Sequence, residues 1–435
     1  MAPLPTALAD LAVPYLERQV WYHRSVAGLS DAPLELVSCE TLRNRPPGLT
    51  RLILVRGARR YQLLVGWRPA NEVGHVLTGR ESSLLGSVAD DGRHLLVYEA
   101  LADDALLLQL LELVTAGRQR AERVRRVSTL VSHASLVFDE RLFMKCYRVL
   151  DDGPRPEAEM MFRLDEVGFD ALLTPIARWR EHGDDLAIVR EFLPSALEGR
   201  LLALTSLRDL LAHASEGDEA ASLETGDPDS EAAAAGGDFA SEMRRLGAMT
   251  AGLHAALHAA FGAQPADPRA LAQLVARPGG ERAAELARRV EEIAPGEAGA
   301  AIRLHGDYHL RRVMRAETGW LVAGFSDDPL YAATQPAPSL APRTGSPIED
   351  LADMCFSLHR VAEEALAQRP EPGSEEAGAL AAAWERRNRA AFLEGYSTSA
   401  GIRRILPGDA ATTELLLAGF ELVRETRYEA TPSED

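Results

Sequence analysis

The pattern of the 435-residue chain changes near residue 200, and this change limits the folds it can adopt. Before that point, short β-rich runs alternate with turns; TRLILVRGA followed by RRYQLLVGWRP predicts an antiparallel hairpin. After residue 238, stretches such as DFASEMRRLGAMTAGLHAALHAAF have apolar residues at helical spacing. A chain this long exceeds one compact core, so we expect an α+β protein of roughly two or three domains.

Charge and apolar runs exclude several classes of function. The net charge of −18 argues against a protein that coats nucleic acid or an anionic membrane, because both require a positive surface. No apolar run reaches the roughly 18 residues of a membrane span, and the N-terminus does not resemble a signal peptide. Cys39, Cys146 and Cys355 lie far apart and are expected to be reduced, partly buried thiols. We therefore expect a cytoplasmic protein.

Four stretches carry specific structural expectations. SLVFDERLFMKCYRVL predicts a hairpin that turns at Asp139 and Glu140, without the glycine that tight turns favour. EAEMMFRLDEVG predicts a helix that ends at Gly168, and DALLLQLLELVTAGRQRAERVRRV predicts one helix, apolar first and basic later. Residues 214–237 are acidic and rich in Ala and Gly, which predicts a disordered insertion.

Lys145 is the only lysine among the 47 basic residues of the chain. A lysine ammonium is a compact point charge on a flexible stem, and the planar guanidinium of arginine often cannot replace it. Lys145 is therefore a candidate phosphate ligand. The alternative is that it remains by chance at a solvent-facing strand position.

Three further stretches contain candidate catalytic or binding residues. LHGDYHLRRV contains His305, Gly306 and Asp307, a tripeptide that is a weak signal by itself. LAIVREF is a strand that ends at Glu191 and Phe192, and WLVAGFSDDP contains two adjacent carboxylates. The paired histidines in GLHAALHAA have no third ligand nearby, so we interpret them as ordinary helix residues.

Together, these motifs resemble the actinobacterial maltokinase and glucosamine kinase family, a branch of the aminoglycoside-phosphotransferase-like kinases. The resemblance covers nearly the whole chain and includes YLERQVWY, SHASLVFDERLFMKCYR, VREFLPSALEGR, SPIEDLADM and FELVRETRYEA. It implies a bilobal, protein-kinase-like α+β fold with a β-rich N-terminal cap. The implied domains are a maltokinase-type cap over 1–90, an ATP-binding lobe over 91–200 and a helical lobe over 201–435.

The resemblance also implies roles for individual residues. Asp307 would accept the proton of a sugar hydroxyl, which is the role of the catalytic-loop Asp in such kinases. Glu159 would pair with Lys145, as a helix Glu does in these enzymes. The implied nucleotide-binding residues are Lys145, Glu159, Glu191 and Phe192, and the implied supports of the catalytic loop are His305 and Asp350.

Two departures from the family pattern affect the expected Mg²⁺ site. Arg312 stands where the family has a metal-binding Gln, and Gly324 stands where it has a metal-binding Asp. Asp327 and Asp328 are the remaining weak candidates for metal ligands, so the resemblance does not predict a complete site. Arg312 is either a surface arginine or a residue that holds phosphate directly.

Two functions therefore stay open. The first is an ATP-dependent, maltokinase-like enzyme that converts maltose, or a related sugar, to a sugar phosphate with weak activity. The second is an inactive pseudokinase that regulates or scaffolds an enzyme of trehalose or glycogen metabolism. Retained Lys145, Glu159 and Asp307 favour the first, whereas Arg312 and Gly324 favour the second.

Overall fold

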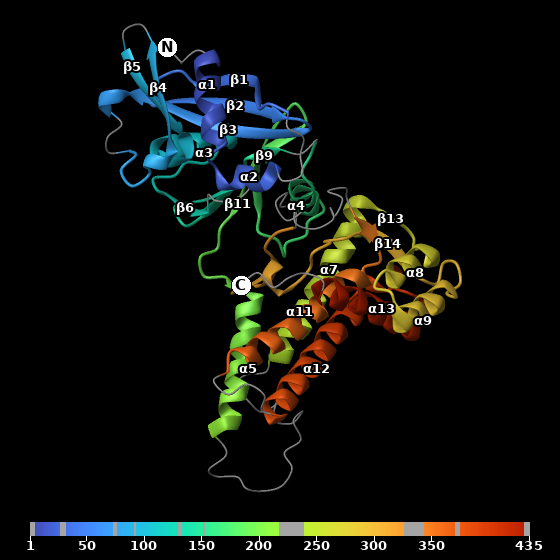
Figure 1. Ribbon diagram of the computed structural model, residues 1–435. Coiled ribbons are helices and arrows are strands. Elements are labelled where there is room, and N and C mark those ends of the chain that lie inside the picture. Colours follow the sequence, from blue (N-terminus) through green and yellow to red (C-terminus); the bar gives the residue numbers. More distant parts are fainter. Residues whose placement is uncertain are drawn as a thin grey trace. The chain divides into compact units, whose positions relative to one another are not determined.

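A computed structural model describes residues 5–26, 32–72, 76–90, 93–128, 133–150, 153–216, 239–325, 343–369 and 375–429. These residues form two compact units, shown in Figure 1. The first unit contains the described residues of Met1–Met161 and Thr174–Pro194. The second contains those of Phe162–Leu173, Ser195–Ser326 and Ala341–Asp435.

The first unit begins with a sheet that two N-terminal helices cover. Its strands follow the order β1 (Glu35–Arg43), β2 (Gly48–Arg56), β3 (Arg59–Pro69), β5 (Arg93–Glu99) and β4 (Leu84–Asp90). The helices are α1 (Pro5–Leu16) and α2 (Val20–Val26). Tyr15, Trp21 and Tyr22 are buried against Leu52 and Tyr61 of the sheet. This burial of aromatic rings fixes the helices on the sheet.

A second sheet of the same unit carries Lys145. Its order is β10 (Pro175–Glu181), β11 (Asp184–Glu191), β8 (Leu142–Tyr147), β7 (His133–Phe138) and β6 (Val124–Ser128). The predicted hairpin is confirmed between β7 and β8, and Asp139 and Glu140 both have φ near +50°. The Asp139 carboxylate accepts hydrogen bonds from the backbone N–H groups of Glu122 and Arg123. These hydrogen bonds help to stabilise the left-handed backbone conformation of a turn that contains no glycine.

The helix predicted over DALLLQLLELVTAGRQRAERVRRV is only partly correct. Helix α3 spans Asp104–Val114, and the chain then turns through Ala116 and Gly117, which have φ values of 51° and 75°. The basic end of the stretch forms β6 instead, paired with β7. The two valines of VRRVS favour a strand, and β7 offers an edge with which that strand can pair. These two effects determine its structure more strongly than the charge pattern that suggested a helix.

One short strand connects the two sheets of the first unit. β9 (Val149–Leu150) follows β8 almost directly and pairs with β3 of the other sheet. Buried Gln62 donates hydrogen bonds to the carbonyl oxygens of Tyr147 (2.7 Å) and Leu186 (3.1 Å). The strand that carries Lys145 is therefore bonded to both sheets.

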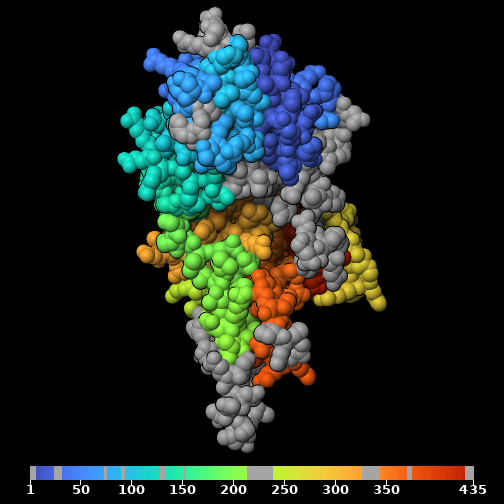
Figure 2. Space-filling model, turned by 60° about the vertical axis from the view of Figure 1, so that its left-hand side comes forward, coloured from blue at the N-terminus to red at the C-terminus, as the bar shows by residue number. Residues whose placement is uncertain are grey.

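The second unit is mainly helical. Its helices include α5 (Gly199–Glu216), α7 (Phe239–Phe261), α8 (Pro268–Ala276), α9 (Gly280–Glu291), α11 (Ile348–Ala367), α12 (Glu375–Ser397) and α13 (Ala410–Glu429). Helices α7 and α12 cross closely, because a Cβ atom on Gly247 would lie 2.0 Å from the carbonyl oxygen of Phe392. The space-filling view shows α5 (green) beside the orange residues of α11 and α12 (Figure 2).

Two small sheets complete the helical unit. One contains β12 (Leu197–Glu198), β15 (Val313–Ala316) and β16 (Gly319–Val322), and the other contains β13 (Ala263–Pro265), β14 (Ala300–Arg303) and β17 (Thr344–Gly345). Of the predicted disordered insertion 214–237, the first three residues belong to α5. The rest lies outside the described residues.

The fold agrees with several expectations from sequence. The α+β class with a β-rich N-terminal part is confirmed, and α4 (Pro156–Glu166) ends before Gly168 as predicted. Cys146 and Cys355 are buried free thiols, and Cys39 is partly buried. Among the described helices, none combines the length and the apolar character needed to cross a membrane.

Candidate active site

Lys145 lies in the middle of β8 and forms an ion pair with the first turn of α4. Its Nζ atom is 2.5 Å from Oε2 of Glu157, and the two side chains are only 12% and 8% exposed. The hydroxyl of Tyr147 lies 3.4 Å from the same carboxylate oxygen. A largely buried ammonium held in this way is positioned by its carboxylate and is not a freely moving surface charge.

Glu157 is thus a helix acid that pairs with Lys145 and that sequence analysis did not name; the implied pairing of Lys145 with Glu159 stays a prediction. Helix α4 begins at Pro156, so both acids lie in its first turn. The charge of Glu159 also contributes to the raised pKa of Arg178, for which the hydrogen bond to Asp185 is the largest cause.

The strand end that carries Glu191 and Phe192, two of the implied nucleotide-binding residues, is part of the second sheet of the first unit. The backbone N–H of Glu191 donates to Thr174 O at 2.9 Å, and that of Phe192 donates to Arg141 O at 2.8 Å. The carbonyl oxygen of Glu191 accepts a hydrogen bond from the side chain of Arg190 at 3.0 Å. Sequence reasoning gave no role to Arg190.

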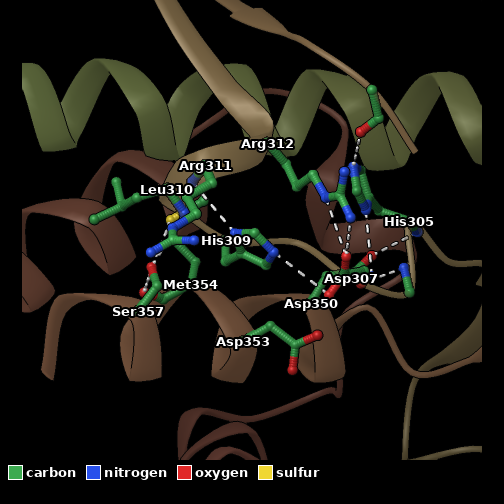
Figure 3. A network of polar contacts seen from close by, with 12 residues as sticks. His305, Asp307, His309, Leu310, Arg311, Arg312, Asp350, Asp353, Met354 and Ser357 are labelled. Carbon is green, nitrogen blue, oxygen red and sulfur yellow. Dashed lines mark hydrogen bonds and ion pairs between the residues drawn. The ribbon is translucent and has the colours of Figure 1, made fainter. Parts of the chain in front are cut away.

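The loop that carries Asp307 lies in the helical unit, between β14 and the 3₁₀ turn η5 (Leu310–Arg312). Asp350, fully buried on α11, accepts hydrogen bonds from the backbone N–H groups of His305 and Gly306, both at 2.9 Å (Figure 3). Gly306 has φ +83°, which glycine adopts without strain. Asp350 thus fixes the loop backbone.

His254 is a supporting residue that sequence analysis treated as an ordinary helix histidine. It is fully buried on α7, where it shares hydrogen bonds with Tyr396 Oη (2.8 Å) and Asp350 Oδ2 (3.3 Å). Burial alone would raise the pKa of Asp350, but the hydrogen bonds with His254 and with the backbone N–H of Gly306 help to hold it below its ordinary value. The pair keeps the supporting carboxylate ionised.

His305 connects the loop to the segment that contains Gly324. Its Nε2 atom donates to the carbonyl oxygen of Gly324 at 3.0 Å, and its ring packs against those of Phe325 and Tyr308. Burial lowers the pKa of His305 to about 4, although the carboxylates of Asp350 and Asp307 favour its charged form. His305 is therefore neutral at physiological pH.

This buried imidazole predicts a pH dependence of stability. An unfolded histidine titrates near 6.5, so between about pH 6.5 and 4 the unfolded chain binds a proton that folded His305 does not. The unfolding free energy should fall by ~3 kcal/mol as the pH drops through this window. His305→Gln, which can still donate to Gly324, should lack this part of the dependence. Urea unfolding of both proteins from pH 7 to 4.5 tests this, and parallel pH profiles would contradict it.

Asp307 is held by two cationic or hydrogen-bonding neighbours. Arg312 contacts its Oδ2 through Nη2 (2.6 Å) and Nε (3.0 Å), and His309 Nε2 lies 3.5 Å from Oδ1 (Figure 3). Burial would raise the pKa of Asp307, but the hydrogen bond with His309 and the charge of Arg312 place it far below its ordinary range. The carboxylate is therefore a weak proton acceptor.

Arg312 and Gly324, which stand where the family has metal ligands, lie close together in the structure. The backbone N–H of Ala323 donates to Arg312 O at 2.8 Å, so Gly324 lies next to the strand that follows Arg312. No group of three or more candidate metal-binding side chains occurs among the described residues, and Asp327 and Asp328 lie outside them. The guanidinium of Arg312 pairs with the Asp307 carboxylate, so the described residues of this loop do not offer the set of free oxygen ligands that Mg²⁺ needs.

Asp353 is a second acid that sequence analysis missed. It lies one turn after Asp350 on α11, is 7% exposed and forms an ion pair with Arg424 of α13. Burial raises its pKa to about 7, although the charge of Arg424 opposes this. An acid one turn after another on the same helix was the signal available in the sequence.

Comparisons with known proteins agree with this geometry. Residues 15–103 match the family model of the maltokinase N-terminal cap domain. A glucosamine kinase structure in complex with glucosamine, ADP and inorganic phosphate matches 98% of this chain and 94% of its own, with a TM-score of 0.59 and 20% identity. Another glucosamine kinase crystal form matches 98% and 92%, with a TM-score of 0.61 and 20% identity. The expected resemblance is confirmed: the chain joins a maltokinase N-terminal cap domain to the fold of glucosamine kinase.

Proposed function

We propose that this chain is a nucleotide-binding protein with a sugar-kinase fold in which phosphate transfer to a sugar is disabled. The observation that carries the proposal is the ion pair between Arg312 and Asp307. It engages the carboxylate that would receive a hydroxyl proton, at a position where a metal ligand was expected. The buried ion pair between Lys145 and Glu157 supports the nucleotide-binding half of the proposal.

Lys145 is the residue that supports nucleotide binding. Its ammonium is fixed by Glu157 on a rigid central strand, and phosphate oxygens are natural additional ligands for a positioned ammonium. The glucosamine kinase of similar fold was captured with ADP and inorganic phosphate. By analogy with that fold, Lys145 would hold the phosphates of a nucleoside triphosphate.

Efficient transfer would require neutralisation of the negative charge on the phosphate. Phosphoryl transfer requires positioned groups that neutralise the charge of the transferring phosphate, and metal ions usually supply much of that neutralisation. In this chain the guanidinium of Arg312 donates two hydrogen bonds to Asp307. The carboxylate is then a poorer base, and the guanidinium is less available to bind phosphate. We infer that transfer is slower by several powers of ten than in an intact kinase.

A second candidate function is an active sugar phosphotransferase. Its specific support is the retained loop geometry, in which Asp350 holds the backbone of His305 and Gly306 and leaves the Asp307 side chain 36% exposed. The acceptor would then be a sugar such as glucosamine or maltose. A scaffolding role with an enzyme of trehalose or glycogen metabolism stays a prediction under the first proposal.

Replacing Lys145 tests nucleotide binding. Lys145→Arg should weaken the affinity for a nucleoside triphosphate by about tenfold or more, because a planar fork cannot keep both the Glu157 contact and the point contact with phosphate. Isothermal titration calorimetry measures the affinity of both proteins. Arg141→Lys, a change at an exposed residue of the same lobe, is the matched control. Equal affinities for the wild type and Lys145→Arg would show that Lys145 is not a phosphate ligand.

A further inference from the structure

A second cation lies on the same sheet face as Lys145. The strand register places Lys145 opposite Ile188, and Phe143 opposite Arg190. Directly paired residues share a face, and positions two apart on a strand share it as well. Lys145 and Arg190 are thus diagonal neighbours, with Cα atoms about 7–8 Å apart in such an arrangement. Glu157 faces this region, and its charge acts on both cations.

The guanidinium of Arg190 is oriented by two contacts. Its Cζ atom lies 4.3 Å from the centroid of the Phe143 ring, and its Nη1 atom donates to the carbonyl oxygen of Glu191 at 3.0 Å. Among the described residues, Nε and Nη2 of Arg190 have no hydrogen-bond partner. Burial lowers the pKa of Arg190 to about 10, which leaves it charged at neutral pH.

The Nε and Nη2 donors of Arg190 favour a ligand that offers hydrogen-bond acceptors. Lys145 is assigned to phosphate, and Arg190 lies farther along β11 toward Phe192, beside an aromatic ring. A nucleotide bound at Lys145 carries one planar group that could lie beside this ring and guanidinium, namely its base. Aromatic and guanidinium groups bind bases by stacking and by edge hydrogen bonds.

From this geometry we propose that Arg190 selects the base of the bound nucleotide and that the site prefers guanine to adenine. Guanine presents two adjacent acceptors, O6 and N7, which match the donor fork of arginine. Adenine presents a donor, its N6 amino group, beside N7 and therefore meets one of the arginine donors with another donor. The proposal rests on nucleotide binding at Lys145, and it replaces the ATP expected from sequence with GTP.

Nucleotide analogues test the proposal on the unmodified full-length chain. We expect GTP to bind about tenfold more tightly than ATP, which is the discrimination that one bidentate contact provides. ITP, which keeps O6 and N7, should bind like GTP, and 7-deaza-GTP should lose much of the advantage. Tripolyphosphate, which has no base, measures the contribution of the phosphates alone. All affinities are measured by calorimetry under one salt condition.

Two variants extend the test. Arg190→Met should bring the affinity ratio of GTP to ATP close to one, and Arg190→Lys, which keeps the charge but not the fork, should do nearly the same. Equal losses for GTP, ATP and tripolyphosphate in Arg190→Met would make Arg190 a phosphate ligand and overturn the proposal. Equal or tighter binding of ATP by the wild type would also overturn it but leave nucleotide binding intact. If none of the nucleotides binds, the proposed function fails as well.

Discussion

The double variant Arg312→Gln, Gly324→Asp is expected to transfer the γ-phosphoryl group of a nucleoside triphosphate to a sugar, and so to release nucleoside diphosphate, at least ~100-fold faster than the wild type in Mg²⁺. Removal of the guanidinium frees the Asp307 carboxylate, to which Arg312 now donates at 2.6 and 3.0 Å. The new amide and carboxylate supply oxygen ligands at two positions that the Ala323–Arg312 hydrogen bond already holds close together.

Control variants separate two possible causes of the faster transfer: removal of the Arg312 charge and the gain of metal ligands. Arg312→Lys keeps a cation near Asp307 and should stay inactive, whereas each single change of the pair should recover only part of the rate. Addition of Asp307→Asn to the double variant should remove the gain, since the carboxylate would then no longer accept a proton. A double variant that folds, binds nucleotide and is no faster than the wild type would show that Arg312 and Gly324 do not limit transfer.

The second large effect concerns stability. Asp350→Ala should lower the unfolding free energy of the helical unit by about 3–5 kcal/mol, because it leaves buried donors on His305, Gly306 and His254 without their acceptor. Urea unfolding gives the change in free energy, and hydrogen exchange of α7 and α11 amides assigns it to this unit.

Asp409 offers a matched control for that substitution. Its carboxylate also accepts two hydrogen bonds, from the backbone and the hydroxyl of Thr412, but the residue is exposed at the start of α13. Asp409→Ala should therefore cost much less, because water replaces the lost acceptor. Equal losses for the two substitutions would mean that Asp350 does not brace the loop.

Much of the fold was predictable because local sequence and tertiary context agree. The strands around Asp139 and the long helix α7 have strong periodic patterns, and the cap resemblance places the β-rich part first. The predicted helix after residue 104 failed at its basic end, where a neighbouring strand edge determined the structure of VRRVS. A charge pattern alone does not reveal such an edge.

The site was predictable in its residues but not in its contacts. Sequence analysis singled out Lys145, Asp307 and Asp350, but it did not name Glu157, the acid in the first turn of α4 that pairs with Lys145. The bond between Arg312 and Asp307 depends on the path of the chain through η5. Arg190 could have been noticed as the charged residue within the apolar run LAIVREF.

The most direct test of the account is the metal dependence of the wild-type chain. Nucleotide affinity is measured by calorimetry in Mg²⁺ and in EDTA, and release of the nucleoside diphosphate (GDP or ADP) is followed with glucosamine and with maltose, using both GTP and ATP. The account predicts affinities that agree within about twofold in the two media, and release no faster than that of Asp307→Asn. Mg²⁺-dependent release that stops in Asp307→Asn would contradict it and identify the protein as an active sugar kinase.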